Sequence, residues 1–315
     1  MRGEAAYQDS VFPPFSLLTF LPFDLSPFLP FPLRLMPILI TKSDGTREPY
    51  RPEKIRATLA RSGARPEIVA HVLEKVTRRV KNGMATRRIH AIVRKELGKE
   101  DRCLAHRYNL RDGLLKLGPS GFTFEKYVAS ILQAYEYATV VPENDMVGLC
   151  VKHEIDVMAE KNGDVIMIEA KFRNDFSDTV NLKDVMSTWA RFQDLQAGSK
   201  KGLCPKFTDV WIVTNGRFSD RAQQFGDCKG IRTVGWSGKE HSLARMVDHQ
   251  ALYPITVLDE LQQWELDAFS KKGLLLCRQV AGKDAAALAR SVGVTKERAA
   301  AIVADCGELV RQPRG

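Results

Sequence analysis

Two short apolar runs near the middle of the chain restrict its fold more than any other stretch. Residues 151–158 and 164–172 are rich in Val, Ile and Met, and a Lys-Asn-Gly-Asp segment separates them. Asn-Gly between two runs of this kind favours the tight turn of an antiparallel hairpin, because both residues tolerate a positive φ. The sequence therefore predicts two neighbouring antiparallel strands, the second of them in the centre of a sheet.

Both predicted strands carry charged residues at positions where a buried strand favours apolar ones. Asp156 lies on the first strand, and Glu169 and Lys171 are two positions apart on the second, so the latter two share a face. Two carboxylates suit a hard cation such as Mg²⁺, which takes its other ligands from water and a substrate phosphate. The lysine could position or deprotonate an attacking water and stabilise charge on phosphorus. The alternative is a solvated, salt-bridged surface, although buried charges must be paired or bind metal.

This stretch resembles the PD-(D/E)xK nucleases, in their Mrr-like branch, which share the restriction-endonuclease-like fold. Asp156 stands where that family has its metal-binding aspartate, and Glu169-Ala170-Lys171 stands where it has its E-x-K motif. Glu125 matches a glutamate that family members often add from the preceding helix. The resemblance implies that Asp156, Glu169 and Glu125 bind Mg²⁺ or Mn²⁺, and that these three side chains are catalytic together with Lys171. Glu125 has a second interpretation, since the helix dipole favours a carboxylate in the first turn.

Length and cysteine usage indicate two or three domains with reduced thiols. The 315 residues are ample for more than one core. The six cysteines include no C-x-x-C pair, which is typical of a cytoplasmic protein without a zinc site. Residues 1–36 are rich in Phe, Pro and Leu, and their prolines interrupt any helix, so neither a signal peptide nor a membrane span is expected. We expect a disordered extension, or an upstream mis-start ahead of Met36.

Positive charge is concentrated in the first part of the chain. The formal net charge is +9, and residues 36–118 hold 20 Lys and Arg against 9 Asp and Glu. From residue 119 onward the two signs nearly balance, at 25 and 26. The partner of the first domain is therefore expected to be anionic, either nucleotide phosphates, nucleic acid or both.

Residues 37–118 predict a small, mostly helical domain. A hairpin with an Asp-Gly turn is expected over residues 38–50, and Pro52 opens a helix. Three more helices are expected at residues 66–82, 86–97 and 101–116. The alternative to a ligand-binding domain is a basic helical unit whose lysines are only solvated or contact DNA. No G-x-x-x-x-G-K-[ST] motif is present, so a bound nucleotide would act as a regulator and not as a fuel.

The helical domain resembles the ATP-cone, a regulatory domain of ribonucleotide reductases and of their repressor. The match covers residues 40–45, Glu48, residues 53–55 and residues 86–90. The resemblance implies that ATP or dATP binds here and that its lysines meet the phosphates. The implied site residues are Ile40, Lys42, Glu48, Lys54, Thr86, His90 and Lys116. The chain departs from the family at Ser43, because the family has Lys-Arg before Asp-Gly, so one phosphate contact is expected to be lost.

Residues 119–245 predict the α/β core. A Gly-Pro-Ser-Gly cluster marks its start, and a helix over residues 122–134 precedes the hairpin. The elements expected after the hairpin are a helix at 182–196, a strand at 209–215, a helix at 219–225 and a strand at 231–236. This order predicts the restriction-endonuclease-like fold, a mixed sheet flanked by helices. Arg191 and Gln193 are candidates for contacts near the scissile phosphate, or else surface residues, and His153 is expected to pack or lie near phosphate.

Residues 246–315 predict a helical tail. Helices are expected at residues 256–269, 274–280, 285–291 and 296–306. The last two flank a Val-Gly-Val-Thr turn and resemble a helix-hairpin-helix, which presents backbone N–H groups to a DNA phosphate. The alternative is a plain helical packing unit.

Together these features predict an Mg²⁺-dependent DNA endonuclease whose activity or oligomeric state is controlled by ATP or dATP. Its expected partners are DNA, the nucleotide and a possible second copy of the chain, with no membrane. The alternative is a non-catalytic nucleotide sensor that binds nucleic acid, or a transcriptional regulator. The presence of Asp156, Glu169 and Lys171 argues against the sensor, and the absence of zinc-ribbon cysteines argues against the regulator.

Overall fold

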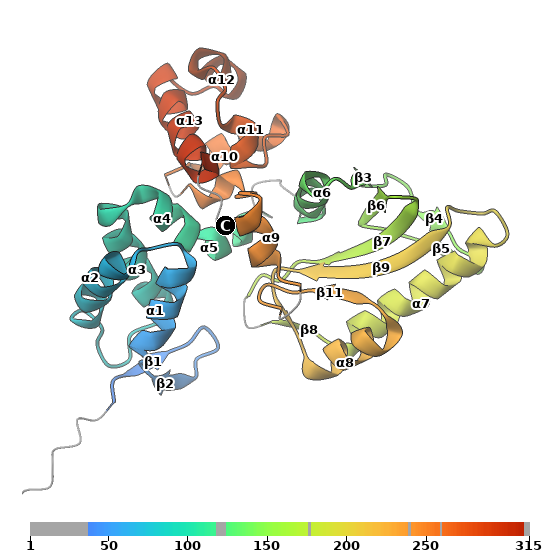
Figure 1. The fold of residues 1–315 in the computed structure, drawn as a ribbon, viewed down its shortest axis with the longest axis horizontal. Helices are drawn as coiled ribbons and strands as arrows, with labels where there is room; N and C mark the ends of the chain where they lie inside the picture. Colours follow the sequence, from blue (N-terminus) through green and yellow to red (C-terminus); the bar gives the residue numbers. More distant parts are fainter. Residues whose placement is uncertain (1–36, 118–123, 176–177, 239–240, 259, 312–315) are drawn as a thin grey trace, which may run out of the picture. The chain divides into compact units, whose positions relative to one another are not determined.

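A five-stranded mixed sheet lies between α6 on one side and α7 and α8 on the other (Figure 1). The computed structural model describes residues 37–117, 124–175, 178–238, 241–258 and 260–311, so the expectations for residues 1–36 fall outside the described residues. The sheet has the strand order β11-β9-β7-β6-β3. Its strands are β3 (Ala138–Val140), β6 (Val157–Lys161), β7 (Asp164–Lys171), β9 (Phe207–Thr214) and β11 (Arg232–Val234). The strand β6 is antiparallel to both of its neighbours, β3 and β7, whereas β7, β9 and β11 are parallel.

Helices cover both faces of this sheet, as the α/β fold class predicted. The helix α6 (Phe124–Ala134) packs on the face that carries Ile166 and Ile168 of β7, whereas α7 (Leu182–Ser199) and α8 (Asp220–Lys229) pack on the face that carries Met167. Because β7 is buried on both faces, its sequence is a near-continuous apolar run. Two pairs of short strands complete the sheet region: β4 (Met146–Val147) with β5 (Lys152–His153), and β8 (Thr179–Val180) with β10 (Arg217–Phe218).

The predicted strand at residues 151–158 is broken in two, which corrects the sequence-based expectation. Lys152 and His153 pair with β4, whereas Val157 begins β6. At the break, the Asp156 side chain, in place of a strand carbonyl, accepts the Ala170 N–H at 2.7 Å. The turn between β6 and β7 is as expected, with positive φ at both its Asn and its Gly.

The helical segment, residues 38–117, begins with a hairpin and continues as five helices in the described part of the chain. The hairpin pairs β1 (Leu39–Thr41) with β2 (Arg47–Pro49), and Gly45 supplies the positive φ of its turn. The helices are α1 (Pro52–Arg61), α2 (Pro66–Thr77), α3 (Thr86–Glu100), α4 (Arg102–Tyr108) and α5 (Leu110–Leu115). The last two were expected as one helix, and they are separated at Asn109, whose buried side chain donates to Val257 O at 3.1 Å.

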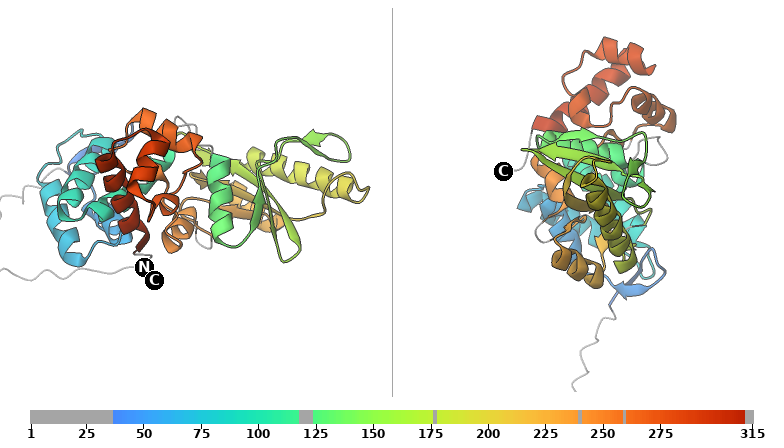
Figure 2. Two further views of the ribbon diagram at one scale, coloured as in Figure 1. Left: turned by 90° about the horizontal axis from the view of Figure 1, so that it is seen from above. Right: turned by 90° about the vertical axis from the view of Figure 1, so that its right-hand side faces the viewer.

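The tail is a group of short helices, coloured orange to red in Figures 1 and 2. Its elements are α9 (Leu243–His249), the 3₁₀ turn η2 (Ile255–Val257), α10 (Gln263–Lys271), α11 (Cys277–Val280), α12 (Ala285–Val292) and α13 (Lys296–Arg311). The expected helix at 256–269 is wrong in its first half. Thr256 lies in η2 and donates to the Gly113 carbonyl of α5, and the helix begins only after the Gln262 cap. Within the described residues, no helix is long and apolar enough to cross a bilayer.

Candidate active site and nucleotide cavity

The β6–β7 hairpin brings the two strand carboxylates to adjacent positions. Val157 is paired with Ile168, so Asp156, the residue before β6, lies beside Glu169 at the same end of the hairpin. The hydrogen bond from Ala170 N–H to Asp156 Oδ2 fixes the aspartate there. The strand β7 ends here, and Arg173, just beyond it, donates to Asp184 in the first turn of α7 at 2.9 Å. The arrangement places two acids at the edge of an otherwise apolar layer.

Glu169 is the buried centre of a charged cluster. Only 3% of its surface is exposed, and each of its carboxylate oxygens has a cationic partner. Lys171 Nζ lies against Oε1, and the Arg191 guanidinium of α7 lies against Oε2. As the alternation of β7 predicted, Glu169 and Lys171 share one face of the strand. Lys171 is 31% exposed, so its amine lies at the mouth of the cluster and not in bulk solvent.

Arg191 is held more firmly than a surface residue would be. It donates to the Glu154 carbonyl at 3.2 Å as well as to Glu169, and its Nε is buried with no hydrogen-bond partner among the described residues. Burial lowers the pKa of this guanidinium from its usual value. Gln193, the other candidate on α7, is exposed and bonds to Gln196 at 3.1 Å, so the structure brings only the first of these two candidates to the cluster.

Burial has the largest effect on the Asp156 carboxyl. Burial raises the pKa of this carboxyl above its usual range, and the negative charge of Glu125 adds to the rise. The Ala170 hydrogen bond and the positive charges of Lys171 and Arg191 oppose it without cancelling it. Glu125 is in the first turn of α6 and is near enough for its charge to act on Asp156. A divalent cation would relieve both the burial cost and the repulsion.

The donor set at this site fits a hard cation in part. Asp156 and Glu169 offer carboxylate oxygens, the ligands that Mg²⁺ prefers, and such ions usually keep several waters and need only one or two carboxylates. Among the residues that the structure describes, no three His, Cys, Asp or Glu side chains gather closely enough to hold a metal. The remaining ligands of an ion held here would therefore be water and a substrate phosphate.

His153 has a structural role beside the site. Its Nε2 pairs with Asp194 Oδ2 of α7 at 2.8 Å, and the same carboxylate accepts the backbone N–H groups of Cys150 and Val151. The hydrogen bond from His153, supported by those from Cys150 and the backbone, lowers the pKa of Asp194 to about 2. This network fastens the 148–153 loop to the helix that carries Arg191.

The residues implied for nucleotide binding fall into two groups. In the first, Glu48 pairs with Lys54 at 2.9 Å and with Lys42 at 3.3 Å. These hydrogen bonds, the one from Lys54 foremost, lower the pKa of Glu48. Ile40 is apart from both groups, since it lies in the hydrophobic core of the helical segment. The two lysines therefore share one acid at the edge of the hairpin.

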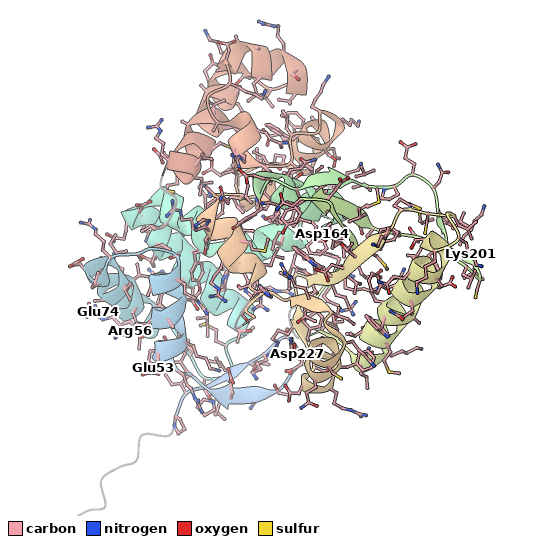
Figure 3. All side chains as sticks on the ribbon, turned by 45° about the vertical axis from the view of Figure 1, so that its right-hand side comes forward. Glu53, Arg56, Glu74, Asp164, Lys201 and Asp227 are labelled. Atoms are coloured by element: carbon pink, nitrogen blue, oxygen red, sulfur yellow. The ribbon has the colours of Figure 1, made fainter. Side chains whose placement is uncertain are left out.

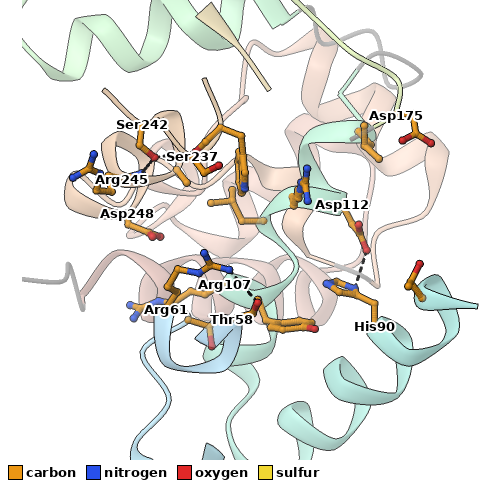
Figure 4. A pocket seen from close by; sticks show the side chains of 18 of the residues that line it. Thr58, Arg61, His90, Arg107, Asp112, Asp175, Ser237, Ser242, Arg245 and Asp248 are labelled. Atoms are coloured by element: carbon orange, nitrogen blue, oxygen red, sulfur yellow. Dashed lines mark hydrogen bonds and ion pairs between the residues drawn. The ribbon is translucent and has the colours of Figure 1, made fainter. Parts of the chain in front are cut away.

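The second group lines a cavity of about 730 Å³, shown in Figure 4. Thr86 and His90 line it, and His90 pairs with Asp112 at 3.2 Å while its ring stacks on Tyr108 at 4.4 Å between centroids. Residues of the first group are neighbours, in sequence, of residues that line the cavity. Lys54 is one turn before the lining residue Thr58 on α1. Likewise Lys42 precedes Ser43, and Lys116 follows Leu115, both of which line the cavity.

Comparison with known proteins agrees with both parts of this description. Residues 38–112 match the family described as the ATP cone domain, and residues 118–240 match the family described as restriction endonuclease, of the Mrr catalytic type. The chain is an ATP-cone fused to an Mrr-type restriction endonuclease-like domain.

This ATP-cone fusion has a close archaeal relative. An uncharacterized protein of Archaeoglobus fulgidus is 37% identical over 164 residues, which are 52% of this chain and 88% of that protein. The chain belongs to the same family as that protein. A crystal structure of a protein of unknown function has a TM-score of 0.49 at 34% identity, and the match covers 59% of this chain and 96% of that one.

Some residues at these two sites of the ATP-cone fusion were not found by sequence reasoning. Asp194 gave no signal, because its partners lie more than forty positions away on a loop. The cavity residues Trp236, at the end of the last predicted strand, and Arg245, beyond it, belong to no motif that indicates a ligand. Arg61 could have been found, since Lys54, Thr58 and Arg61 follow the spacing of one helix face.

Proposed function

We propose that this protein is a divalent-cation-dependent deoxyribonuclease controlled by ATP or dATP. The observation that carries the proposal is the buried Glu169 carboxylate, held between Lys171 and Arg191 and beside Asp156. A charged cluster at this depth is costly unless its charges are paired or used, and such clusters concentrate at functional sites. The family match to restriction endonucleases supports the same chemistry.

Each side chain has a role in this proposal. Asp156 and Glu169 hold the cation, and Glu125 assists from α6. Lys171 positions the attacking water, because its amine stands at the mouth of the cluster. A Mg²⁺ or Mn²⁺ ion bound here would activate a water and neutralise charge on the scissile phosphate.

Arg191 completes the proposed site as a phosphate-binding group. In the absence of an ion, Arg191 and Lys171 neutralise the Glu169 carboxylate. If Asp156 and Glu169 held a cation, the Arg191 guanidinium could meet a phosphate, with its buried Nε as an additional donor.

Nucleotide control is the second half of the proposal. The ATP-cone match and the arginine-lined cavity next to His90 support binding of ATP or dATP in the helical segment. Lys42 and Lys54 would meet the phosphates, and a bound nucleotide would compete with Glu48 for their ammonium groups. The effect on the nuclease is exerted on cleavage rate or on assembly with a second copy of the chain.

One assay tests the proposal. Purified protein is incubated with duplex, single-stranded and branched DNA in Mg²⁺, Mn²⁺ or EDTA, each with and without ATP. We expect cation-dependent cleavage of some DNA that Asp156→Asn removes without unfolding the protein. Calorimetry with ATP and dATP should give weaker binding for Lys54→Ala than for wild type, and equal heats would contradict nucleotide control.

A non-catalytic nucleotide sensor is the second candidate. It is favoured by the full pairing of Glu169 with two cations and by the lack, in the described chain, of three clustered metal-binding side chains. The same DNA panel separates the candidates. DNA that is bound, as judged by fluorescence anisotropy, but not cut in any cation would favour the sensor.

A further inference from the structure

The cavity beside His90 has two walls that come from distant parts of the sequence (Figure 4). One wall belongs to the helical segment and includes Thr58, Arg61 and His90. The second wall is formed by the segment that follows β7, the segment that follows β11, and the helix α9. It is made by Asn174, Asp175, Trp236, Ser237, Arg245 and Asp248. In Figure 4 the His90–Asp112 pair stands on one side of the cavity, and Arg245 and Asp248 stand on the other.

Direct contacts hold the first wall to the tail. Asn109 Nδ2 donates to Val257 O at 3.1 Å, and Thr256 Oγ1 donates to Gly113 O at 2.7 Å. At Gly113 the two backbones approach so closely that an added Cβ would lie 2.8 Å from a Val257 methyl carbon and 3.0 Å from its Cα. Because these contacts are buried and involve backbone atoms, the helix that carries Arg111 and Asp112 is fixed to η2.

The charges of the cavity select an anion. Five arginines and three aspartates line it, which leaves two positive charges in excess when His90 is neutral. The charged residues are Arg61, Arg87, Arg107, Arg111, Arg245, Asp112, Asp175 and Asp248. Burial lowers the pKa of Arg111 to about 10, so even this arginine stays charged at neutral pH. Guanidinium groups on opposite walls suit a polyphosphate, which accepts several charge-assisted hydrogen bonds at once.

The second wall is connected to the candidate active site. Asn174 is three residues beyond Lys171 on the segment that leaves β7. The intervening Arg173 exchanges two backbone hydrogen bonds with the Asn215 side chain, at 2.7 and 2.8 Å, and its guanidinium donates to Asp184 at 2.9 Å. Asp184 belongs to the capping box that begins α7, the helix that carries Arg191.

We propose that the nucleotide site of this protein is composite, so that a nucleoside triphosphate in the cavity contacts both the helical segment and the second wall. The proposal rests on the nucleotide control proposed above and adds how it reaches the nuclease. A ligand that bridges the walls fixes the 172–175 segment, and with it Lys171 and the start of α7. The active site is then more ordered in the nucleotide-bound state than in the empty state. A ligand couples two sites only if it interacts differently with two such states.

The test measures ATP binding to the full chain by calorimetry in wild type and three arginine variants. Arg245→Gln alters the second wall, and Arg61→Gln alters the first. Arg221→Gln is the matched control, since this exposed residue lies on α8, outside the lining of the cavity. We expect the first two variants to weaken ATP binding about tenfold, the loss typical of one charge-assisted contact, and the control to match wild type. Circular dichroism confirms that each variant is folded.

A second measurement follows the segment that is proposed to respond. Hydrogen exchange of the peptide over residues 172–175 should slow when ATP binds to wild type, and should not slow in Arg245→Gln. If Arg245→Gln binds ATP as wild type does while Arg61→Gln is weakened, the composite site is wrong and the proposed nucleotide control stands. If wild type fails to bind ATP, both are wrong. ATP binding with the expected differences, but without DNA cleavage, supports the composite site and contradicts the proposed nuclease.

Discussion

Arg191 on α7 donates to the Glu169 carboxylate on β7, at the oxygen opposite the one that Lys171 contacts. The acid of the E-x-K motif therefore depends on a residue outside the motif. Removing Arg191 leaves the buried Glu169 charge less compensated, so the stability of the sheet depends on this ion pair in the candidate site.

The first prediction concerns this pair. Arg191→Met should lower the free energy of unfolding by about 2 kcal/mol, because Glu169 keeps Lys171 but loses its second cation. In the Glu169→Gln background the same change should have a smaller effect, since no buried charge remains to be compensated. Urea unfolding measures both. A loss no larger than that of the exposed Arg221→Met would contradict the pairing.

Two helical glycines give a second prediction. An added Cβ at Gly198 of α7 would lie 2.8 Å from the Gly148 carbonyl carbon, whereas at Gly307 of α13 the nearest atom is a flexible arginine end at 3.6 Å. Gly307→Ala should therefore stabilise by about 0.5–1 kcal/mol through helix propensity, and Gly198→Ala should destabilise by about 1–3 kcal/mol through the backbone clash. Similar effects of both changes on thermal unfolding would show that the 148–153 loop does not pack on α7.

The third prediction is a pH dependence at Asp194. Hydrogen bonds from His153 and from the loop N–H groups lower the pKa of its carboxyl to about 2, below the unfolded value of about 4. Because the folded pKa is the lower one, the stabilisation is fully present above the unfolded pKa and is lost as pH falls through the folded pKa. Asp194→Asn should thus differ most from wild type above about pH 5, and the difference should narrow between about pH 4 and pH 2. Denaturant titrations at several pH values measure it, and Asp164→Asn on the exposed hairpin, labelled in Figure 3, is the control.

A fourth prediction uses the departure of this chain from the ATP-cone pattern. Ser43 lines the cavity where the family has an arginine, so Ser43→Arg should add one phosphate contact and tighten ATP binding by about tenfold. Ser43→Gln supplies similar bulk without charge and should leave affinity unchanged. Calorimetry in which both variants behave alike would contradict a phosphate position at this turn. Arg56→Gln, which removes an exposed positive charge from α1 (labelled in Figure 3), is the control for a general effect of charge on ATP binding.

Local patterns in the sequence were sufficient for the hairpin and for the order of the main elements. The Asn-Gly turn and the near-continuous apolar run of β7 follow from residues adjacent in sequence, and so does the shared face of Glu169 and Lys171. The break before β6 could not be predicted in this way. There the Asp156 carboxylate accepts a hydrogen bond from a backbone N–H fourteen positions away, which no periodicity indicates.

Residues joined only by tertiary structure were beyond sequence reasoning. The second wall of the cavity combines Asn174 with Trp236 and Arg245, which belong to no common motif and lie on segments that meet only in the folded chain. The helix α9, which carries Arg245, was not predicted at all, since its seven residues are too few for a clear helical pattern. Arg191 was named as a candidate, but its depth of burial and its partner required the packing of α7 on the sheet.

The most direct test of the nuclease proposal is the rate of cation-dependent DNA cleavage in Lys171→Met. The matched control is Lys201→Met, since this exposed lysine lies just beyond α7 and is labelled in Figure 3. With both variants folded by circular dichroism, we predict that Lys171→Met lowers the rate at least about a hundredfold, because the group that positions the water is lost, while Lys201→Met cuts as wild type does. Equal rates for wild type and Lys171→Met, or no cleavage by wild type in any cation across the DNA panel, would contradict the account.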